Sequence, residues 1–233
     1  RRKEKSTSSL TKRIVRDLKS LFISRISEKM LYCTDNLIIS GFIGVGTVGR
    51  YANYCMITQA ISNILTILAN TIQPTVGDYF TEKNHQRNYE ILRQLTFGFF
   101  CIASVISVGL FSLITPFVRD IWLGPSYELG WGITVLCIVV LLVRIMGLPL
   151  SLVMGVTGLF EKEKNVGASS ALLNLIVSLA LVKPYGMAGV LLGTLLSYLL
   201  QIVYRYIIYF RDFLEMPGEA LRYAQDIGEY LAV

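Results

Sequence analysis

The feature that most constrains the fold is a series of long apolar stretches separated by short polar or charged segments. An α-helix rises about 1.5 Å per residue, so about 20 residues cross the hydrocarbon core of a bilayer. Only 16% of the residues are charged, against about 25% in soluble domains. We therefore expect an all-α membrane protein in which six transmembrane helices form one bundle. The predicted spans are residues 18–40, 47–73, 91–114, 130–150, 166–182 and 187–210.

The remaining residues are interpreted as connections and flanks. Residues 1–17 form a basic linker, and residues 211–233 form an amphipathic tail, so the chain is expected to be part of a longer protein. Helix ends are predicted near Pro74 and Pro116, and a break is predicted near Gly147 and Pro149. Turns or loops are expected at residues 41–50, 81–90, 115–131, 161–165 and 183–186.

The basic residues are distributed asymmetrically about the predicted spans. Of the 22 Lys and Arg residues, 16 lie on the side of the two termini, including Arg205, three lie on the opposite side and three lie within spans. Cytoplasmic loops of membrane proteins carry an excess of Lys and Arg. The distribution predicts that both ends of this segment are cytoplasmic, and it accounts for the net charge of +6 without a nucleic-acid partner.

The first span carries ionisable residues on one side. At 100° per residue, six of its polar side chains fall within an arc of about 120°, opposite a largely apolar face. Each charge at bilayer depth costs about 2.5–3.5 kcal/mol, so this arc predicts a face on a polar cavity. The alternative is a ladder of buried ion pairs that only fixes packing. The arc contains Arg25, Glu28, Lys29, Tyr32, Asp35 and Asn36.

These residue types suggest two kinds of binding. Arg25 and Lys29 suit an anion such as a phosphate, whereas Glu28 and Asp35 suit a coupling cation or proton. Arg144, near the middle of the fourth span, either pairs with an acid of another helix or faces the same cavity. The candidate substrate-binding residues are Arg25, Lys29, Tyr32, Asn36, Asn63, Asn70 and Arg144.

The second span has a milder polar stripe, confined to an arc of about 100°. Amides and hydroxyls in membrane helices either join helices to one another or line a cavity, and four turns of stripe favour lining. The stripe consists of Gln59, Ser62, Asn63, Thr66, Asn70 and Gln73.

Catalysis is not expected. The single histidine, His85, lies in a polar segment, and no Ser or Cys has a candidate base nearby in sequence. The four cysteines lie in separate apolar stretches without metal-ligand spacing, and the glycines of GVGTVG suit a tight turn rather than a phosphate loop. We predict no enzyme activity, no cofactor and no metal.

Four runs of sequence resemble one transporter family, in the order expected for it. They are TDNLIISGFIGVGTVGRYANY at Thr34–Tyr54, ANTIQPTVGDY at Ala69–Tyr79, IWLGPSY at Ile121–Tyr127 and LVKPYGMAGVLLGTLLS at Leu181–Ser197. Together they resemble the C-terminal half of Wzx-type polysaccharide flippases, which belong to the multidrug/oligosaccharidyl-lipid/polysaccharide exporter superfamily. The resemblance covers residues 18–210.

The resemblance implies two six-helix bundles around a central cavity, of which this chain would be the second. It implies that undecaprenyl-diphosphate-linked oligosaccharide repeat units cross the bacterial cytoplasmic membrane for capsule, O-antigen or exopolysaccharide synthesis. The implied partners are this lipid-linked substrate, membrane lipid and the first bundle, with a polysaccharide polymerase and glycosyltransferases nearby.

Other functions remain open from the residues alone. Within the same superfamily the alternatives are a drug or cation antiporter and a flippase of the peptidoglycan lipid precursor. Outside transport, one alternative is a membrane transferase, which would need a cluster of acidic or His residues that we do not find in the sequence. The other is a structural or regulatory membrane module, which would not need polar stripes on two spans.

Overall fold

The computed structural model describes residues 15, 18–20, 22–23, 26–27, 29–30, 33–80 and 84–213. Within this part of the chain every regular element is helical, which confirms the all-α class. The elements are α2 (Val45–Phe80), α3 (His85–Pro116), the π-helical η1 (Phe117–Trp122), the 3₁₀-helical η2 (Pro125–Tyr127), α4 (Trp131–Met146), α5 (Leu148–Val156), α6 (Phe160–Tyr185) and α7 (Met187–Asp212).

Among the described residues, five helical segments are long and apolar enough to cross a membrane, which supports a multi-pass membrane protein. They are Val45–Phe80, His85–Trp122, Trp131–Val156, Lys162–Tyr185 and Met187–Arg211. The first predicted span lies partly outside the described residues. Those of its residues that are described are helical, and residues 33–42 form a continuous helix that ends before Gly44.

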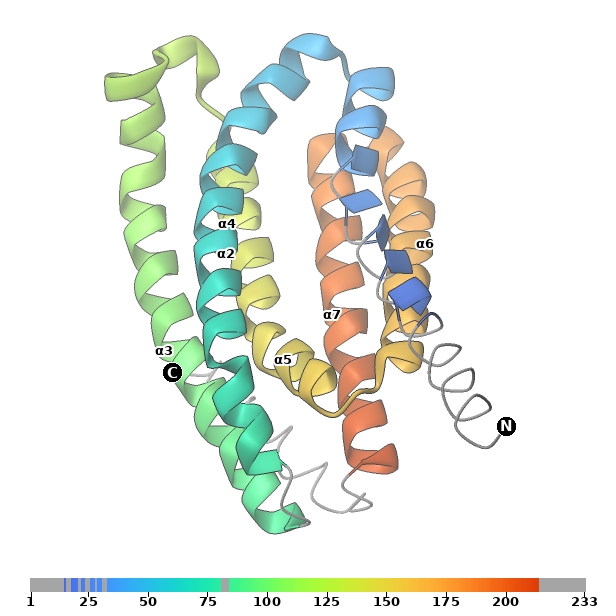
Figure 1. The fold of residues 1–233 in the computed structure, drawn as a ribbon. Coiled ribbons are helices and arrows are strands. Elements are labelled where there is room, and N and C mark those ends of the chain that lie inside the picture. Colours follow the sequence, from blue (N-terminus) through green and yellow to red (C-terminus); the bar gives the residue numbers. More distant parts are fainter. Residues whose placement is uncertain are drawn as a thin grey trace.

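The helices stand side by side as a bundle (Figure 1). α2 and α3 lie on one side, α6 and α7 on the other, and α4 and α5 between them. The two larger of the three apolar clusters in the described residues join most of the helices. One joins the ends of α2, α4 and α7 near the α3–α4 connection through Tyr54, Ile138 and Leu191. The other joins α2, α3, α5 and α7 toward the α2–α3 connection and includes Leu92 and Tyr209.

α6 and α7 form the most extensively packed helix pair. Gly186 makes the turn between them with φ 57°, a conformation that glycine adopts without strain. Gly189 and Gly193 then bring the backbones together, because an added Cβ would overlap the Leu181 carbonyl or the Ser178 side chain. Small residues at such positions let membrane helices approach closely.

Several helices are longer than predicted. α2 continues through Pro74 to Phe80, and α3 begins at His85, inside the predicted loop 81–90, with the Asn84 side chain accepting from the Arg87 amide. Helix also replaces much of the loop predicted at 115–131 and all of the turn predicted at 161–165. Glu and Lys favour helix, and neighbouring helices in membranes tolerate proline. The predicted break at Gly147 is present, between α4 and α5.

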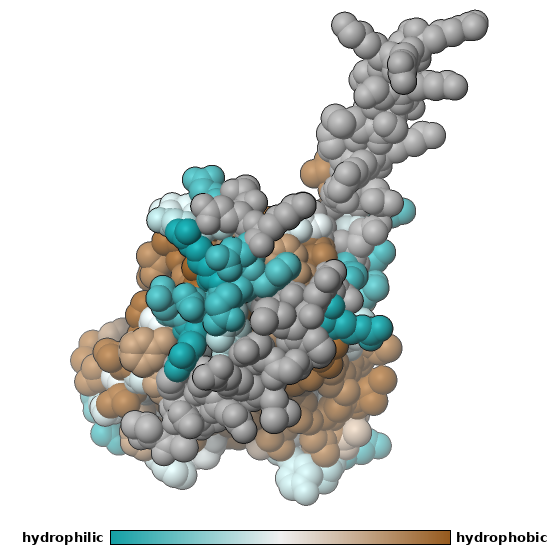
Figure 2. Space-filling model, turned by 90° about the horizontal axis from the view of Figure 1, so that it is seen from below, coloured by the Kyte–Doolittle hydropathy of each residue, from teal (hydrophilic) through white to brown (hydrophobic). Residues whose placement is uncertain are grey.

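The two ends of the bundle differ in their number of Lys and Arg residues. The end with the α2–α3 connection, the lower end in Figure 1, carries Arg87, Arg93, Lys162, Lys164 and Arg211 near helix termini. Viewed from this end, hydrophilic residues gather on it and hydrophobic residues surround them (Figure 2). The opposite end carries Arg50, Arg119 and Lys183. One prediction is corrected, because Arg205 lies buried within α7 rather than in a flank.

Candidate functional site

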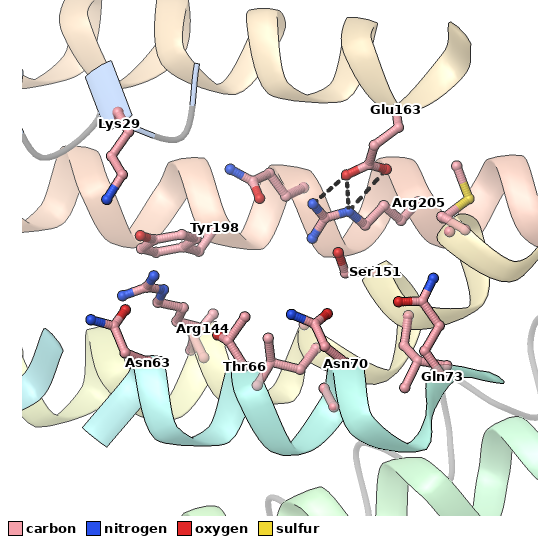
Figure 3. A pocket seen from close by; sticks show the side chains of 18 of the residues that line it. Lys29, Asn63, Thr66, Asn70, Gln73, Arg144, Ser151, Glu163, Tyr198 and Arg205 are labelled. Atoms are coloured by element: carbon pink, nitrogen blue, oxygen red, sulfur yellow. Dashed lines mark hydrogen bonds and ion pairs between the residues drawn. The ribbon is translucent and has the colours of Figure 1, made fainter. Parts of the chain in front are cut away.

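A polar cavity of about 320 Å³ lies between α2 and the facing helices α4, α5, α6 and α7. Figure 3 shows the α2 side chains pointing across this space toward α7. Its polar lining residues are Lys29, Gln59, Asn63, Thr66, Asn70, Gln73, Arg144, Ser151, Glu163, Tyr198, Gln201 and Arg205.

The α2 wall consists of the polar stripe that the sequence indicates. Five of its six members line the cavity, at alternating spacings of four and three residues, whereas Ser62 is buried away from it. Gln59 Nε2 donates to Asn63 Oδ1 at 2.9 Å, which aligns the two amides. Of the two roles left open by the sequence, cavity lining is the one that the geometry favours.

Arg144 reaches the cavity from the last turn of α4. Its NH1 donates to Gln59 Oε1 at 3.1 Å, and its Cζ lies 6.0 Å from the centre of the Tyr198 ring. This position allows a cation–π interaction with Tyr198. The guanidinium is therefore held beside Asn63 and Lys29, at one end of the cavity, by one residue from α2 and one from α7 (Figure 3).

Lys29 faces Arg144 from the other side of the cavity. It is exposed, and its amino group points toward Tyr198 and Arg144 (Figure 3). Two basic side chains from helices far apart in sequence thus converge on one space. Arg25, Glu28 and Tyr32 lie outside the described residues.

Asp35 lies in a separate, buried cluster between the first helix, α6 and α7. Its Oδ2 accepts from Thr194 Oγ1 at 2.7 Å and its Oδ1 from Asn174 Nδ2 at 3.4 Å. The Val190 carbonyl accepts from Thr194 Oγ1 and Ser178 Oγ, each at 3.3 Å. The buried Asn174 Oδ1 accepts no hydrogen bond within the described residues. These oxygens suit a hard cation or a proton.

A small cavity of about 40 Å³ connects the two regions, since it is lined by Asp35 and Thr194 as well as by Arg144 and Tyr198. This volume is enough for a water molecule. Asn36, in contrast, is exposed and is not among the lining residues of either cavity. The structure therefore unites Lys29, Asn63, Asn70 and Arg144, places Asp35 beside them and leaves Asn36 apart.

An ion pair that sequence reasoning missed lies on the α6–α7 side of the cavity (Figure 3). Arg205 Nε donates to Glu163 Oε1 at 3.0 Å and to Oε2 at 3.2 Å, and both side chains are largely buried. The signal that points to this wall is the three- and four-residue spacing of Tyr198, Gln201 and Arg205 on the last span. Glu163 was missed because it lies in residues 161–165, which the sequence predicts as a turn.

Replacing Glu163 by glutamine is expected to destabilise the bundle by about 3 kcal/mol, because it leaves the Arg205 charge buried beside a neutral partner. The measurement is the free energy of unfolding in detergent micelles. The double variant Glu163→Gln/Arg205→Met removes both charges and should recover most of the loss. Arg205→Met alone completes the cycle, and if its loss and that of Glu163→Gln simply add in the double variant, the pair makes no coupled contribution.

The side chains of the cavity supply charged and hydrogen-bonding groups. Within the described residues no group of three or more His, Cys, Asp or Glu side chains could hold a metal ion. The cavity offers guanidinium and ammonium groups for an anion, and amides and hydroxyls for a hydroxylated ligand.

A scan of protein-family models and searches of curated proteins and solved structures find no match to this chain.

Proposed function

We propose that the chain is the second bundle of a flippase for undecaprenyl-diphosphate-linked oligosaccharides in surface polysaccharide synthesis. The observation that carries the proposal is the cavity that Lys29 and Arg144 share with a row of amides, inside a bundle of apolar helices. Such a cavity shelters a polar, anionic headgroup from hydrocarbon. The full protein would have six spans in this bundle and a first bundle opposite.

In this proposal, different residues of the cavity bind different parts of the headgroup. Lys29 and Arg144 bind the diphosphate, Arg144 through its fork and Lys29 as a point charge. Asn63, Asn70 and their neighbours on α2 hydrogen-bond sugar hydroxyls. The isoprenoid tail stays in the bilayer, and rocking of the two bundles alternates access to the headgroup site.

The charge of the cavity favours an anionic substrate over an organic cation. The carboxylate of Glu163 is paired with Arg205, and Asp35 is bound in its own cluster. Among the described lining residues, Lys29 and Arg144 therefore give the cavity a net positive charge. A drug or cation antiporter would need the opposite sign, whereas a flippase of the peptidoglycan lipid precursor would use the same chemistry.

The proposed orientation rests on the unequal number of Lys and Arg residues at the two ends of the bundle. The end that carries more Lys and Arg is proposed to face the cytoplasm, in accordance with the distribution of basic residues in membrane proteins. Glycosyltransferases and a polysaccharide polymerase would then supply and consume the lipid-linked unit on opposite sides.

Asp35 is proposed to hold the coupling cation or proton. Replacing it by asparagine in the full-length protein is expected to abolish the dependence of transport on a Na⁺ or proton gradient, because the cluster loses the carboxylate charge that attracts a cation or takes up a proton. The measurement is the transport rate with and without each gradient. Asp120→Asn, at an exposed acid of η1, is the control, and an unchanged gradient dependence in Asp35→Asn would contradict this role.

The proposed function is tested with the full-length protein in liposomes that contain a fluorescent undecaprenyl-diphosphate-linked sugar. We expect the protein to expose the probe to a membrane-impermeant quencher on the outer leaflet and not to transport ethidium, an organic cation. Transport of ethidium without translocation of the lipid-linked sugar would contradict the proposal.

A further inference from the structure

A second hollow lies on the outer seam between α2 and α3, on the face of α2 opposite the polar cavity. Its volume is about 710 Å³, and Leu68, Ile72 and Tyr79 of α2 line it. At 100° per residue, these side chains lie about 180° from Asn63 and Asn70. A ligand here is therefore separated from the headgroup cavity by the whole width of α2.

Sequence features of both helices account for the hollow. α2 packs more extensively on α4 and α5 than on α3, and it contains Pro74, which removes one hydrogen bond of the helix. On α3 the hollow is lined by Gly98, and a Cβ added there would meet nothing within 4 Å. The space is thus a property of the packed helices rather than of one flexible side chain.

The polarity of the lining changes along the seam. Leu68, Leu95 and Ile102 line the part toward the middle of the bundle, and Arg87 and Glu90 line the part at the basic end. From Arg87 to Ile102, α3 rises about 22 Å, which matches one leaflet of a bilayer of 40–45 Å with its headgroup layer. This gradient is complementary to one lipid molecule standing in a single leaflet.

The hollow, which we call the α2–α3 groove, carries charges of both signs at the end lined by Arg87 and Glu90. The Arg87 guanidinium lies over the Tyr79 ring, with its Cζ 5.2 Å from the ring centre. Stacking uses the face of a guanidinium, whereas a phosphate is bound at its edge. The Glu90 carboxylate, three residues further along the same helix face, suits an ammonium group. A phosphate and an ammonium on one headgroup define a zwitterionic lipid.

We propose that the α2–α3 groove binds phosphatidylethanolamine, with one acyl chain along Leu68, Leu95 and Ile102 and the headgroup between Arg87 and Glu90. This site is independent of the flippase proposal, because it needs only that the chain spans a membrane. It would hold a structural lipid on the outside of the bundle.

The test uses the full chain in liposomes that contain phosphatidylethanolamine with a photoactivatable diazirine on one acyl chain. After irradiation, peptide mapping is expected to locate the lipid adduct on the facing parts of α2 and α3. Gly98→Phe should reduce this labelling about tenfold by filling the groove. The matched control is Gly109→Phe on the same helix, where an added Cβ also meets nothing within 4 Å, and its labelling should be unchanged.

The headgroup is tested by competition between unlabelled lipids. Phosphatidylethanolamine should displace the probe better than phosphatidylglycerol, and Glu90→Gln should reduce this preference about tenfold, as expected for loss of one charge-assisted hydrogen bond. Glu128→Gln, an exposed acid at the other end of the bundle, should leave it unchanged. Equal labelling of Gly98→Phe and the parent chain would overturn the proposal, as would labelling that appears only after residues 214–233 are deleted.

Discussion

Gly189→Ala is expected to destabilise the bundle by about 3 kcal/mol, the upper part of the range for overpacking a close-packed interior. The new Cβ would overlap the carbonyl group and the side chain of Leu181 on α6. Backbone cannot rotate away as a flexible side chain can, so α6 and α7 would have to separate. Their separation would also disturb the cluster around Asp35, because Asn174 and Thr194 come from these two helices.

The matched control is Gly109→Ala on α3, where the added methyl group meets nothing within 4 Å. Alanine favours helix over glycine by about 0.5–1 kcal/mol, so this variant should be neutral or slightly more stable. The measurement for both is the free energy of unfolding in mixed micelles. Equal effects of the two exchanges would show that α6 and α7 do not depend on close backbone contact.

Arg144→Ala in the full-length protein is expected to lower translocation of the lipid-linked sugar by tenfold to about a hundredfold. This range corresponds to loss of one charge-assisted hydrogen bond to a phosphate. Arg144→Lys keeps the charge but not the planar fork, so an intermediate rate is expected. Lys29→Ala should also lower the rate, because Lys29 faces the same space.

Arg119→Ala is the control for Arg144, since Arg119 is an exposed arginine that pairs with Asp120 in η1, outside the cavity. Its rate should match that of the parent protein, and the unfolding free energies of all variants separate loss of function from loss of structure. Full activity of both Arg144→Ala and Lys29→Ala would remove the cationic cavity from the mechanism.

The polar stripe of α2 illustrates what could be predicted from sequence. Asn63 and Asn70 are seven residues apart, so helical geometry alone puts them on one face, and hydrophobicity decides which face meets lipid. The same reasoning applied to Tyr198, Gln201 and Arg205 points to the opposite wall. It does not reveal that the two walls face one another.

Helix boundaries were the weaker part of the prediction. Residues 161–165 are charged and were interpreted as a turn, yet they form the start of α6. The charge of these residues indicated contact with water. Contact with water does not require a break in the helix, so the turn did not follow. Glu163, within this segment, gains a buried partner only because α6 packs on α7.

By itself, the sequence determined the all-helical class, the apolar helices able to cross a membrane and the polar face of α2, because these depend on composition and on a local period of 3.6 residues. Only the tertiary structure decided that Asp35 meets Thr194, that Gln59 meets Arg144 and that Glu163 meets Arg205. These partners are 159, 85 and 42 residues apart, and the packing of whole helices sets which of them come within hydrogen-bonding distance.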